Sequence, residues 1–184
     1  MSKAIILVGA TGCGKTVFTK RIIKGVNKKA LLVFDVNDEY GEFYDEEFTP
    51  DMDDFLDKIY DQKTKKHKVK NCVCLFEDAT SFFSTRGRDD LMVKLLVGKR
   101  HSNNTYILLF HSMQDVPKYI IRKCTDMVIF KTLDDPKYVE QNFNYSGIYK
   151  NWKEVDEKTK KNPFYSSQPP PKNTVPDFKH FRLY

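Results

Sequence analysis

The chain has 184 residues, of which 40% are hydrophobic and 30% charged, and its formal net charge is +6. This length suits one domain with a short extension, and the apolar content is enough to bury a core, which excludes wholesale disorder. No apolar run reaches the roughly 18–20 residues that span a bilayer, and the apolar start is too short for a signal peptide, so we expect a cytoplasmic protein.

Short apolar runs alternate with segments of helical periodicity along most of the chain. The apolar runs predict buried strands at residues 3–8, 30–34, 71–76, 105–110 and 127–130. Apolar residues at helical spacing predict intervening helices near residues 17–26, 52–61, 89–100, 116–122 and 135–142. Strands with little polar alternation are typical of a sheet that is covered on both faces. The order of elements therefore predicts an α/β fold with a mostly parallel sheet.

The charges are distributed unevenly in the middle of the chain. Residues 38–61 hold eleven acids and one base, whereas residues 62–70 hold five lysines and no acid. Such a reversal indicates a polar surface that meets another subunit or a polyanion, and two solvated loops of opposite sign are the alternative.

The composition changes again after about residue 150. Residues 150–161 are highly charged, and three consecutive prolines at 169–171 favour an extended polyproline conformation. We therefore expect a folded domain over residues 1–150 and a charged, proline-rich tail over residues 151–184. Phe178, Phe181 and Tyr184 could anchor the end of that tail on the domain or on a neighbour.

The strongest motif joins the first predicted strand to the first predicted helix. It matches the phosphate-loop pattern G-x-x-x-x-G-K-[ST] at every fixed position. Its residues are Gly9, Ala10, Thr11, Gly12, Cys13, Gly14, Lys15 and Thr16. The loop's backbone N–H groups would surround the β-phosphate of ATP, Lys15 would bridge the β- and γ-phosphates, and Thr16 would coordinate Mg²⁺. The motif predicts a nucleoside triphosphate site with ATP and Mg²⁺ as cofactors.

Two other classes of phosphate-loop protein fit the sequence less well. A GTPase would carry an Asn-Lys-x-Asp motif after a late strand, and the chain has none. A kinase of a nucleotide or small molecule fits the length, but it would need an arginine-rich lid, and the chain has only six arginines without such a cluster. The kinase reading stays as an alternative.

Acidic residues follow the third predicted strand, where a motor ATPase places its metal-holding and water-orienting groups. Glu77 would support Mg²⁺, and Asp78 would polarise the attacking water. The usual order in motor ATPases is Asp then Glu, so the inverted order leaves the two roles open. Asp35, at the end of the second predicted strand, is a second candidate for the metal-side acid.

A polar loop follows the fourth predicted strand. A side-chain amide at this place can contact the γ-phosphate and respond to its loss, and Gln114 is the candidate. His111 and Ser112 lie nearer the end of the strand and are alternatives.

Taken together, these segments resemble the FtsK–HerA superfamily of DNA-pumping ATPases, and its viral genome-packaging branch in particular. The matching stretches are residues 9–16, 34–40, 75–79, 98–103 and 114–117 leading to 124–130. The resemblance implies a RecA-like (ASCE) fold with strand order 5-1-4-3-2. It also implies a ring, usually a hexamer, that couples ATP hydrolysis to the translocation of DNA.

Within that resemblance, Arg100 corresponds to an arginine finger that reaches the γ-phosphate of a neighbouring subunit. A planar guanidinium suits a phosphate oxyanion. Arg86 and Arg88 compete for this role, and a structural arginine at a helix C-terminus is the other alternative. Residues 82–88 form a candidate DNA-facing loop, although a plain surface loop is nearly as consistent with the sequence.

The expected function is therefore ATP-driven translocation of DNA, as in a viral packaging motor. The expected partners are double-stranded DNA bound without sequence preference, further copies of the chain in a ring, and a capsid or membrane-vertex protein held by the C-terminal tail. The expected location is the host cytoplasm or the virion. A zot-like, nucleotide-dependent phage assembly protein is a further alternative, although that group carries a membrane span.

Overall fold

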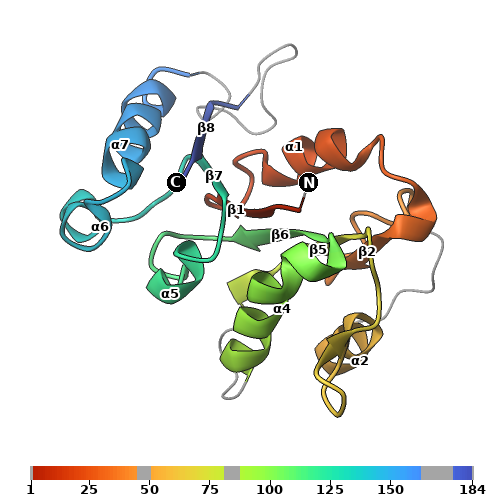
Figure 1. Cartoon of the computed structure of the whole chain (residues 1–184). Helices are drawn as coiled ribbons and strands as arrows, with labels where there is room; N and C mark the ends of the chain where they lie inside the picture. The colour runs from red at the N-terminus through yellow and green to blue at the C-terminus, as the bar shows by residue number, and fades with distance from the viewer. Residues whose placement is uncertain (1, 45–50, 81–87, 163–175, 184) are drawn as a thin grey trace.

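The structure, a computed structural model, describes residues 2–44, 51–80, 88–162 and 176–183. Its centre is a six-stranded sheet in the order β2-β5-β6-β1-β7-β8 (Figure 1). The strands are β1 (Ala4–Val8), β2 (Leu31–Phe34), β5 (Val73–Phe76), β6 (Thr105–Phe110), β7 (Asp126–Phe130) and β8 (Phe178–Arg182). Only β8 runs antiparallel to its neighbour, and the other five strands are parallel. The α/β fold and the strand order expected for the first five strands are confirmed.

The parallel strands are buried because apolar side chains point to both faces of the sheet. In β1 and β6 the register runs from Ala4 opposite Tyr106 to Val8 opposite Phe110. Burial of both faces explains why these strands read as continuous apolar runs in the sequence.

Helices cover the two faces unequally. The helices are α1 (Lys15–Ile23), α2 (Met52–Ile59), α4 (Arg88–Ser102), α5 (Lys118–Ile121), α6 (Pro136–Phe143) and α7 (Ile148–Thr159), with a short 3₁₀ turn η1 (Lys28–Ala30). Buried side chains of α2, α4, α5, α6 and α7 share one core cluster, whereas Ile23 of α1 belongs to the cluster on the other face. Figure 1 shows α1 on the opposite side of the sheet from α2, α4 and α5.

The charge reversal in the middle of the chain contains a turn that the sequence did not predict. Helix α2 ends at Ile59, and β3 (Tyr60–Asp61) then pairs with β4 (Lys66–His67) in an antiparallel hairpin. The Asp61 carboxylate accepts hydrogen bonds from the backbone N–H groups of Lys63 and Thr64, which closes the hairpin turn.

The described parts of residues 151–184 contain a helix and a strand that the sequence analysis did not assign. Helix α7 crosses residue 150 and buries Ile148, Trp152 and Val155 on one face. Strand β8 joins the sheet by pairing with β7 through the backbone. The sequence of α7 contains so many charged residues that its apolar residues, which recur every 3.6 positions, are difficult to recognise. Strand β8 pairs through backbone groups, which do not depend on the order of side chains. Whether residues 1–150 form an independent domain stays a prediction.

The C-terminal aromatic residues anchor the strand as expected where they are described. The Phe178 ring lies 4.8 Å from the Phe18 ring and 5.5 Å from the Phe130 ring, measured between centroids. Phe181 packs against the main core cluster. Tyr184 and the three prolines at 169–171 lie outside the described residues.

Candidate nucleotide-binding site

The phosphate loop is fixed at the carboxyl edge of the sheet by backbone hydrogen bonds to two strands. The N–H of Gly9 donates to the carbonyl of Phe110 at 3.1 Å, and the N–H of Ala10 donates to that of Lys131 at 2.8 Å. A Cβ at Gly9 would lie 2.6 Å from the Cβ of Phe130, so only glycine fits there. Gly14 has a φ of +96°, a conformation that glycine adopts without strain.

The start of α1 has no side-chain cap. Gly14 caps the helix and offers no side-chain hydrogen bond, so the first backbone N–H groups depend on another acceptor. A helix N-terminus that follows a glycine-rich loop is a favourable phosphate site because its N–H groups and its dipole both favour an anion.

Lys15 is folded back into this loop. Its side chain is 7% exposed and its Nζ donates to the carbonyls of Gly9 and Ala10. Burial lowers the pKa of Lys15, and the negative charges of Glu77, Glu39 and Asp78 partly oppose this effect. The lysine is therefore held at the site by two backbone carbonyls of the phosphate loop.

Thr16, the predicted Mg²⁺ ligand, contacts an acid that the motif analysis did not assign. Its hydroxyl donates to the Glu39 carboxylate at 2.9 Å. Glu39 comes from the loop after β2, and this loop is closed by Asp35. Thr16 and Glu39 therefore form a hydroxyl–carboxylate pair at the mouth of the phosphate loop.

Asp35 holds the loop rather than offering an open ligand position. It is 1% exposed, and its carboxylate accepts the backbone N–H groups of Glu39 at 3.0 Å and Tyr40 at 2.7 Å. The Tyr44 hydroxyl lies 3.5 Å away. With these donors in place, Asp35 positions Glu39, and the geometry favours Glu39 and Glu77 over Asp35 as metal-side acids.

Glu77 is a buried acid of the site whose pKa is raised. It is 8% exposed and accepts a hydrogen bond from Asn37 Nδ2 at 3.2 Å. Burial, together with the negative charges of Glu39, Asp78 and Asp35, raises its pKa to about 7. A cation bound beside Glu77 would favour the charged form of this carboxylate.

Asp78 is more accessible than Glu77 and points to a different partner. Its Oδ1 accepts the backbone N–H of Thr80 at 3.0 Å and lies 4.0 Å from Nε2 of His111. The structure therefore brings the end of β5 and the loop after β6 together.

The loop after β6 is shaped by a buried acid that sequence reasoning missed. Asp134, which follows β7, accepts the backbone N–H of Met113 at 2.9 Å and that of Gln114 at 3.4 Å. The Ser112 hydroxyl donates to Asp115 at 2.7 Å. Gln114 is exposed at the same edge of the sheet as the phosphate loop. Its contact with a γ-phosphate stays a prediction.

The candidate arginine finger lies at the other end of the sheet. Arg100 is at the C-terminal end of α4, which precedes the start of β6, whereas the phosphate loop follows the end of β1. It therefore cannot belong to the nucleotide site of its own subunit. Arg86 and the loop at 82–87 lie outside the described residues, as does the side chain of Arg88.

Comparison with known proteins places this site in a family. A family model described as the central domain of the helicase HerA matches residues 1–114, which is more than half of the chain. The chain belongs to the HerA central-domain family. The resemblance to FtsK–HerA phosphate-loop ATPases is thus confirmed. No curated protein matches the sequence significantly.

Solved structures confirm the RecA-like α/β fold of this HerA-family chain. B204, the DNA-packaging ATPase from Sulfolobus turreted icosahedral virus, superposes with a TM-score of 0.65 at 16% identity over 84% of this chain and 87% of that one. The genome packaging NTPase B204 of Sulfolobus turreted icosahedral virus 2 in complex with ATP-gammaS gives 0.63 at 19% identity over 84% and 86%. Its complex with AMPPCP gives 0.64 at 17% identity over 99% and 93%.

In this HerA-family chain the C-terminal segment also reaches the phosphate loop. A Cβ at Gly14 would lie 2.5 Å from Cγ of Pro176, just before β8. The side chain of Asp177 accepts a hydrogen bond from Asn162 Nδ2 at 2.7 Å. No motif could have signalled this contact, because it depends on the pairing of β8 with β7.

The described residues contain neither a metal-binding cluster nor a membrane-spanning helix. They contain no group of three or more His, Cys, Asp or Glu residues arranged to hold a metal ion. Mg²⁺ commonly keeps its waters and uses one or two carboxylates together with substrate phosphates, so it does not require such a cage.

Across the same residues, no helix has both the length and the apolar character needed to cross a membrane.

Proposed function

We propose that this chain is an ATPase that couples hydrolysis to the movement of double-stranded DNA, as a genome-packaging motor. The observation that carries the proposal is the phosphate loop, in which the buried Lys15 donates to the loop carbonyls and the Thr16 hydroxyl donates to the Glu39 carboxylate at 2.9 Å. Membership of the HerA family and the likeness to two viral packaging NTPases support the coupling to DNA.

The residues at the mouth of the loop fit a Mg²⁺ ion. The Thr16 hydroxyl, the Glu39 carboxylate at 2.9 Å from it, and the buried Glu77 offer hard oxygen ligands of the kind Mg²⁺ binds. The raised pKa of Glu77 supports this fit, because a cation would relieve the repulsion among the acids. When bound, Mg²⁺ neutralises the charge that develops on the phosphate oxygens during transfer.

Each remaining residue has a separate task in this proposal. Lys15 leaves the carbonyls of Gly9 and Ala10 and donates to the β- and γ-phosphates. Asp78, the more exposed acid, orients the attacking water and accepts its proton. Glu39 is the competing water-side group because it is exposed beside Thr16. Gln114 contacts the γ-phosphate from the loop that Asp134 holds.

Assembly into a ring, with six subunits as the expected number, completes the proposed site. Arg100 lies at the edge of the sheet opposite the phosphate loop of its own subunit. This position supports a role toward the γ-phosphate bound by a neighbouring subunit. A capsid or membrane-vertex protein would bind through the C-terminal segment. The host cytoplasm and the virion are the proposed locations.

The test of this function is ATP hydrolysis measured with and without double-stranded DNA, on protein whose mass in solution is recorded alongside. A motor should hydrolyse ATP faster with DNA, in a ring, and should displace a triplex-forming strand as it moves along a duplex. Transfer of radiolabelled phosphate to a small acceptor would favour the kinase alternative. Assembly that needs ATP but gives no strand displacement would favour the zot-like alternative.

A further inference from the structure

Two adjoining hollows lie at the amino edge of the sheet, opposite the nucleotide site. The first has a volume of about 750 Å³ and lies between the end of α4, the starts of β1 and β7, and the end of β8. The second, of about 470 Å³, lies between α4 and the β3–β4 hairpin. Both are lined by Val97 and His101, so the hollows adjoin on either side of α4.

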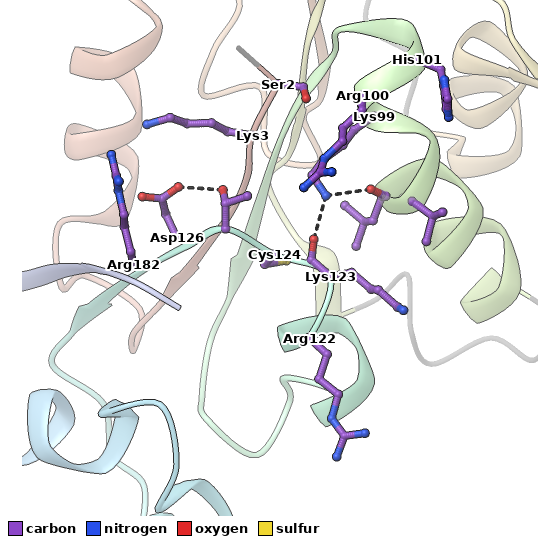
Figure 2. Close-up of a pocket in the computed structure, with 13 residues that line it drawn as sticks. Ser2, Lys3, Lys99, Arg100, His101, Arg122, Lys123, Cys124, Asp126 and Arg182 are labelled. Carbon is purple, nitrogen blue, oxygen red and sulfur yellow. Dashed lines mark hydrogen bonds between the residues drawn. The ribbon is translucent and has the colours of Figure 1, made fainter. Parts of the chain in front are cut away.

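The first hollow is lined by cationic side chains from separate elements. They are Lys3, Lys99, Arg100, Arg122, Lys123 and Arg182. Figure 2 shows Lys3, Arg100 and Arg182 on the side of Asp126, whereas Arg122 and Lys123 extend away from them and His101 lies on the other side of α4 from Lys99. The second hollow adds four lysines, Lys65, Lys66, Lys70 and Lys94.

Opposing charge is almost absent from both linings. The only carboxylate among their described lining residues is Asp126. It already accepts a hydrogen bond from the Thr125 hydroxyl at 2.7 Å and lies 3.0 Å from Nε2 of His180. Among the described residues no carboxylate lies within ion-pair distance of Arg100, Arg122 or Lys123.

A buried lysine holds the walls of the first hollow together. Lys99 is 8% exposed, and its Nζ donates to the carbonyls of Leu96 and Lys123, each at 2.9 Å (Figure 2). This links α4 to the segment before β7 and fixes the spacing of Arg100 and Lys123. The hollow is therefore a built part of the fold rather than a chance grouping of flexible lysines.

The hairpin wall of the second hollow is fixed as well. A Cβ at Gly98 would lie 2.3 Å from Nε2 of His67, so the hairpin approaches α4 at its glycine. The Tyr106 hydroxyl lies 3.2 Å from Nδ1 of the same histidine. The lysines of the hairpin are thereby held beside α4.

We propose that these two hollows form one basic track that binds the phosphodiester backbone of a nucleic acid. The track is defined by the cationic lining residues of both hollows other than Arg100, which the proposed function assigns to the nucleotide of a neighbouring subunit. It follows the amino ends of the strands from β5 to β8, four strand spacings of about 4.8 Å or about 19 Å in total. A DNA duplex has one phosphate per strand about every 3.4 Å of its axis, so about five or six phosphates of one strand fit this length.

Geometry favours a nucleic acid over other anions. A free phosphate would fill one hollow and leave the other unused, whereas a backbone runs through both. Arginine and lysine together bind phosphate oxygens, and the nucleotide site's acids lie at the opposite edge, away from the bound polyanion. The choice of nucleic acid over an acidic polypeptide, such as residues 38–61 of a second copy, rests on the proposed function.

Charge reversal on the track, compared with equal charge reversal elsewhere, tests the proposal. The track variant is Lys66→Glu with Lys123→Glu, one exposed lysine from each hollow. The matched control is Lys150→Glu with Lys153→Glu, two exposed lysines of α7 that line neither hollow. Each variant changes the net charge by the same amount, and circular dichroism melts check that each folds.

Binding of fluorescent double-stranded DNA of mixed sequence is measured by anisotropy, without nucleotide, across a series of salt concentrations. The track variant should bind about tenfold more weakly or worse, and the slope of log K against log salt should fall by about 2. The control should change little. Equal losses in both variants, no loss in either, or no binding by the unmodified protein would each overturn the proposal.

Two additions separate the alternatives. Polyglutamate at matched charge should fail to displace the DNA, and efficient displacement would instead assign the track to an acidic polypeptide. Lys66→Gln with Lys123→Gln replaces the first variant if charge reversal prevents folding. Basal ATP hydrolysis without DNA should be unchanged in the track variant. Failure to hydrolyse ATP would refute the proposed function and leave the binding result interpretable.

Discussion

Glu77→Gln should change the pH dependence of stability more than its overall level. The folded protein holds Glu77 at a pKa of about 7, compared with an ordinary value of 4.5, because burial and the charges of Glu39 and Asp78 disfavour the ionised form. At a pH between these two pKa values, the Glu77 carboxyl group has lost its proton in the unfolded chain but keeps it in the folded protein. The free energy of unfolding of the nucleotide-free protein should therefore fall as pH rises through this interval.

The size of the effect follows from the two pKa values. A difference of one pKa unit corresponds to about 1.4 kcal/mol, so the shift from 4.5 to about 7 corresponds to about 3 kcal/mol once Glu77 is fully ionised. Glutamine resembles the protonated carboxyl group and keeps the hydrogen-bonding atoms that face Asn37. Glu77→Gln should therefore match the unmodified protein below about pH 4 and exceed it by about 3 kcal/mol near pH 8.

Urea unfolding at several pH values measures this difference. Glu140→Gln, on the exposed face of α6, is the matched control and should leave the pH profile unchanged. The gain in Glu77→Gln should come with weaker Mg²⁺-dependent ATP binding, because the amide cannot replace a carboxylate ligand. Parallel stability profiles for Glu77→Gln and the unmodified protein would show that Glu77 is not held protonated, and the assignment of the acid cluster would fail.

Three further variants test the remaining roles. Lys15→Ala should abolish measurable ATP turnover, since the lysine's charge is directed at the phosphates, and turnover at the normal rate would refute the site. Asp78→Asn should lower kcat by about 10²–10⁴ with nearly normal nucleotide affinity. If Glu39→Gln has this effect instead, Glu39 is the water-side acid. Arg100→Ala should bind ATP but hydrolyse it poorly, and mixing it with Lys15→Ala should restore part of the activity at concentrations where rings form. Mixed rings without recovery would exclude a finger acting between subunits.

The sequence predicted the parts of this fold that depend on local order. The phosphate loop needs a fixed run of residues between a strand and a helix, so Gly9 to Thr16 could be assigned from spacing alone. Buried parallel strands need continuous apolar runs, which made β1, β5 and β6 recognisable. The order of the strands came from the family resemblance, and the structure agrees with it.

The residues that were missed depend on contacts between distant segments. Glu39 reaches Thr16 only because the Asp35 carboxylate closes the loop after β2. Asp134 acts on the backbone of Met113, twenty-one positions earlier, and no pattern links the two. Strand β8 pairs through its backbone, and its short mixture of aromatic and basic residues does not predict a strand.

The fold joins the two edges of the sheet by short and rigid connections. Lys3 of the basic track is separated from Gly9 of the phosphate loop only by β1, whose residues are buried between β6 and β7. Lys123 precedes β7, and the carbonyl of Lys131 after that strand holds Ala10. A polyanion that shifts β1 or β7 along its length would move the phosphate loop with it, because packed strands move as units rather than bending. If the track binds DNA, hydrolysis should therefore respond to DNA through these two strands, without any contact between DNA and nucleotide.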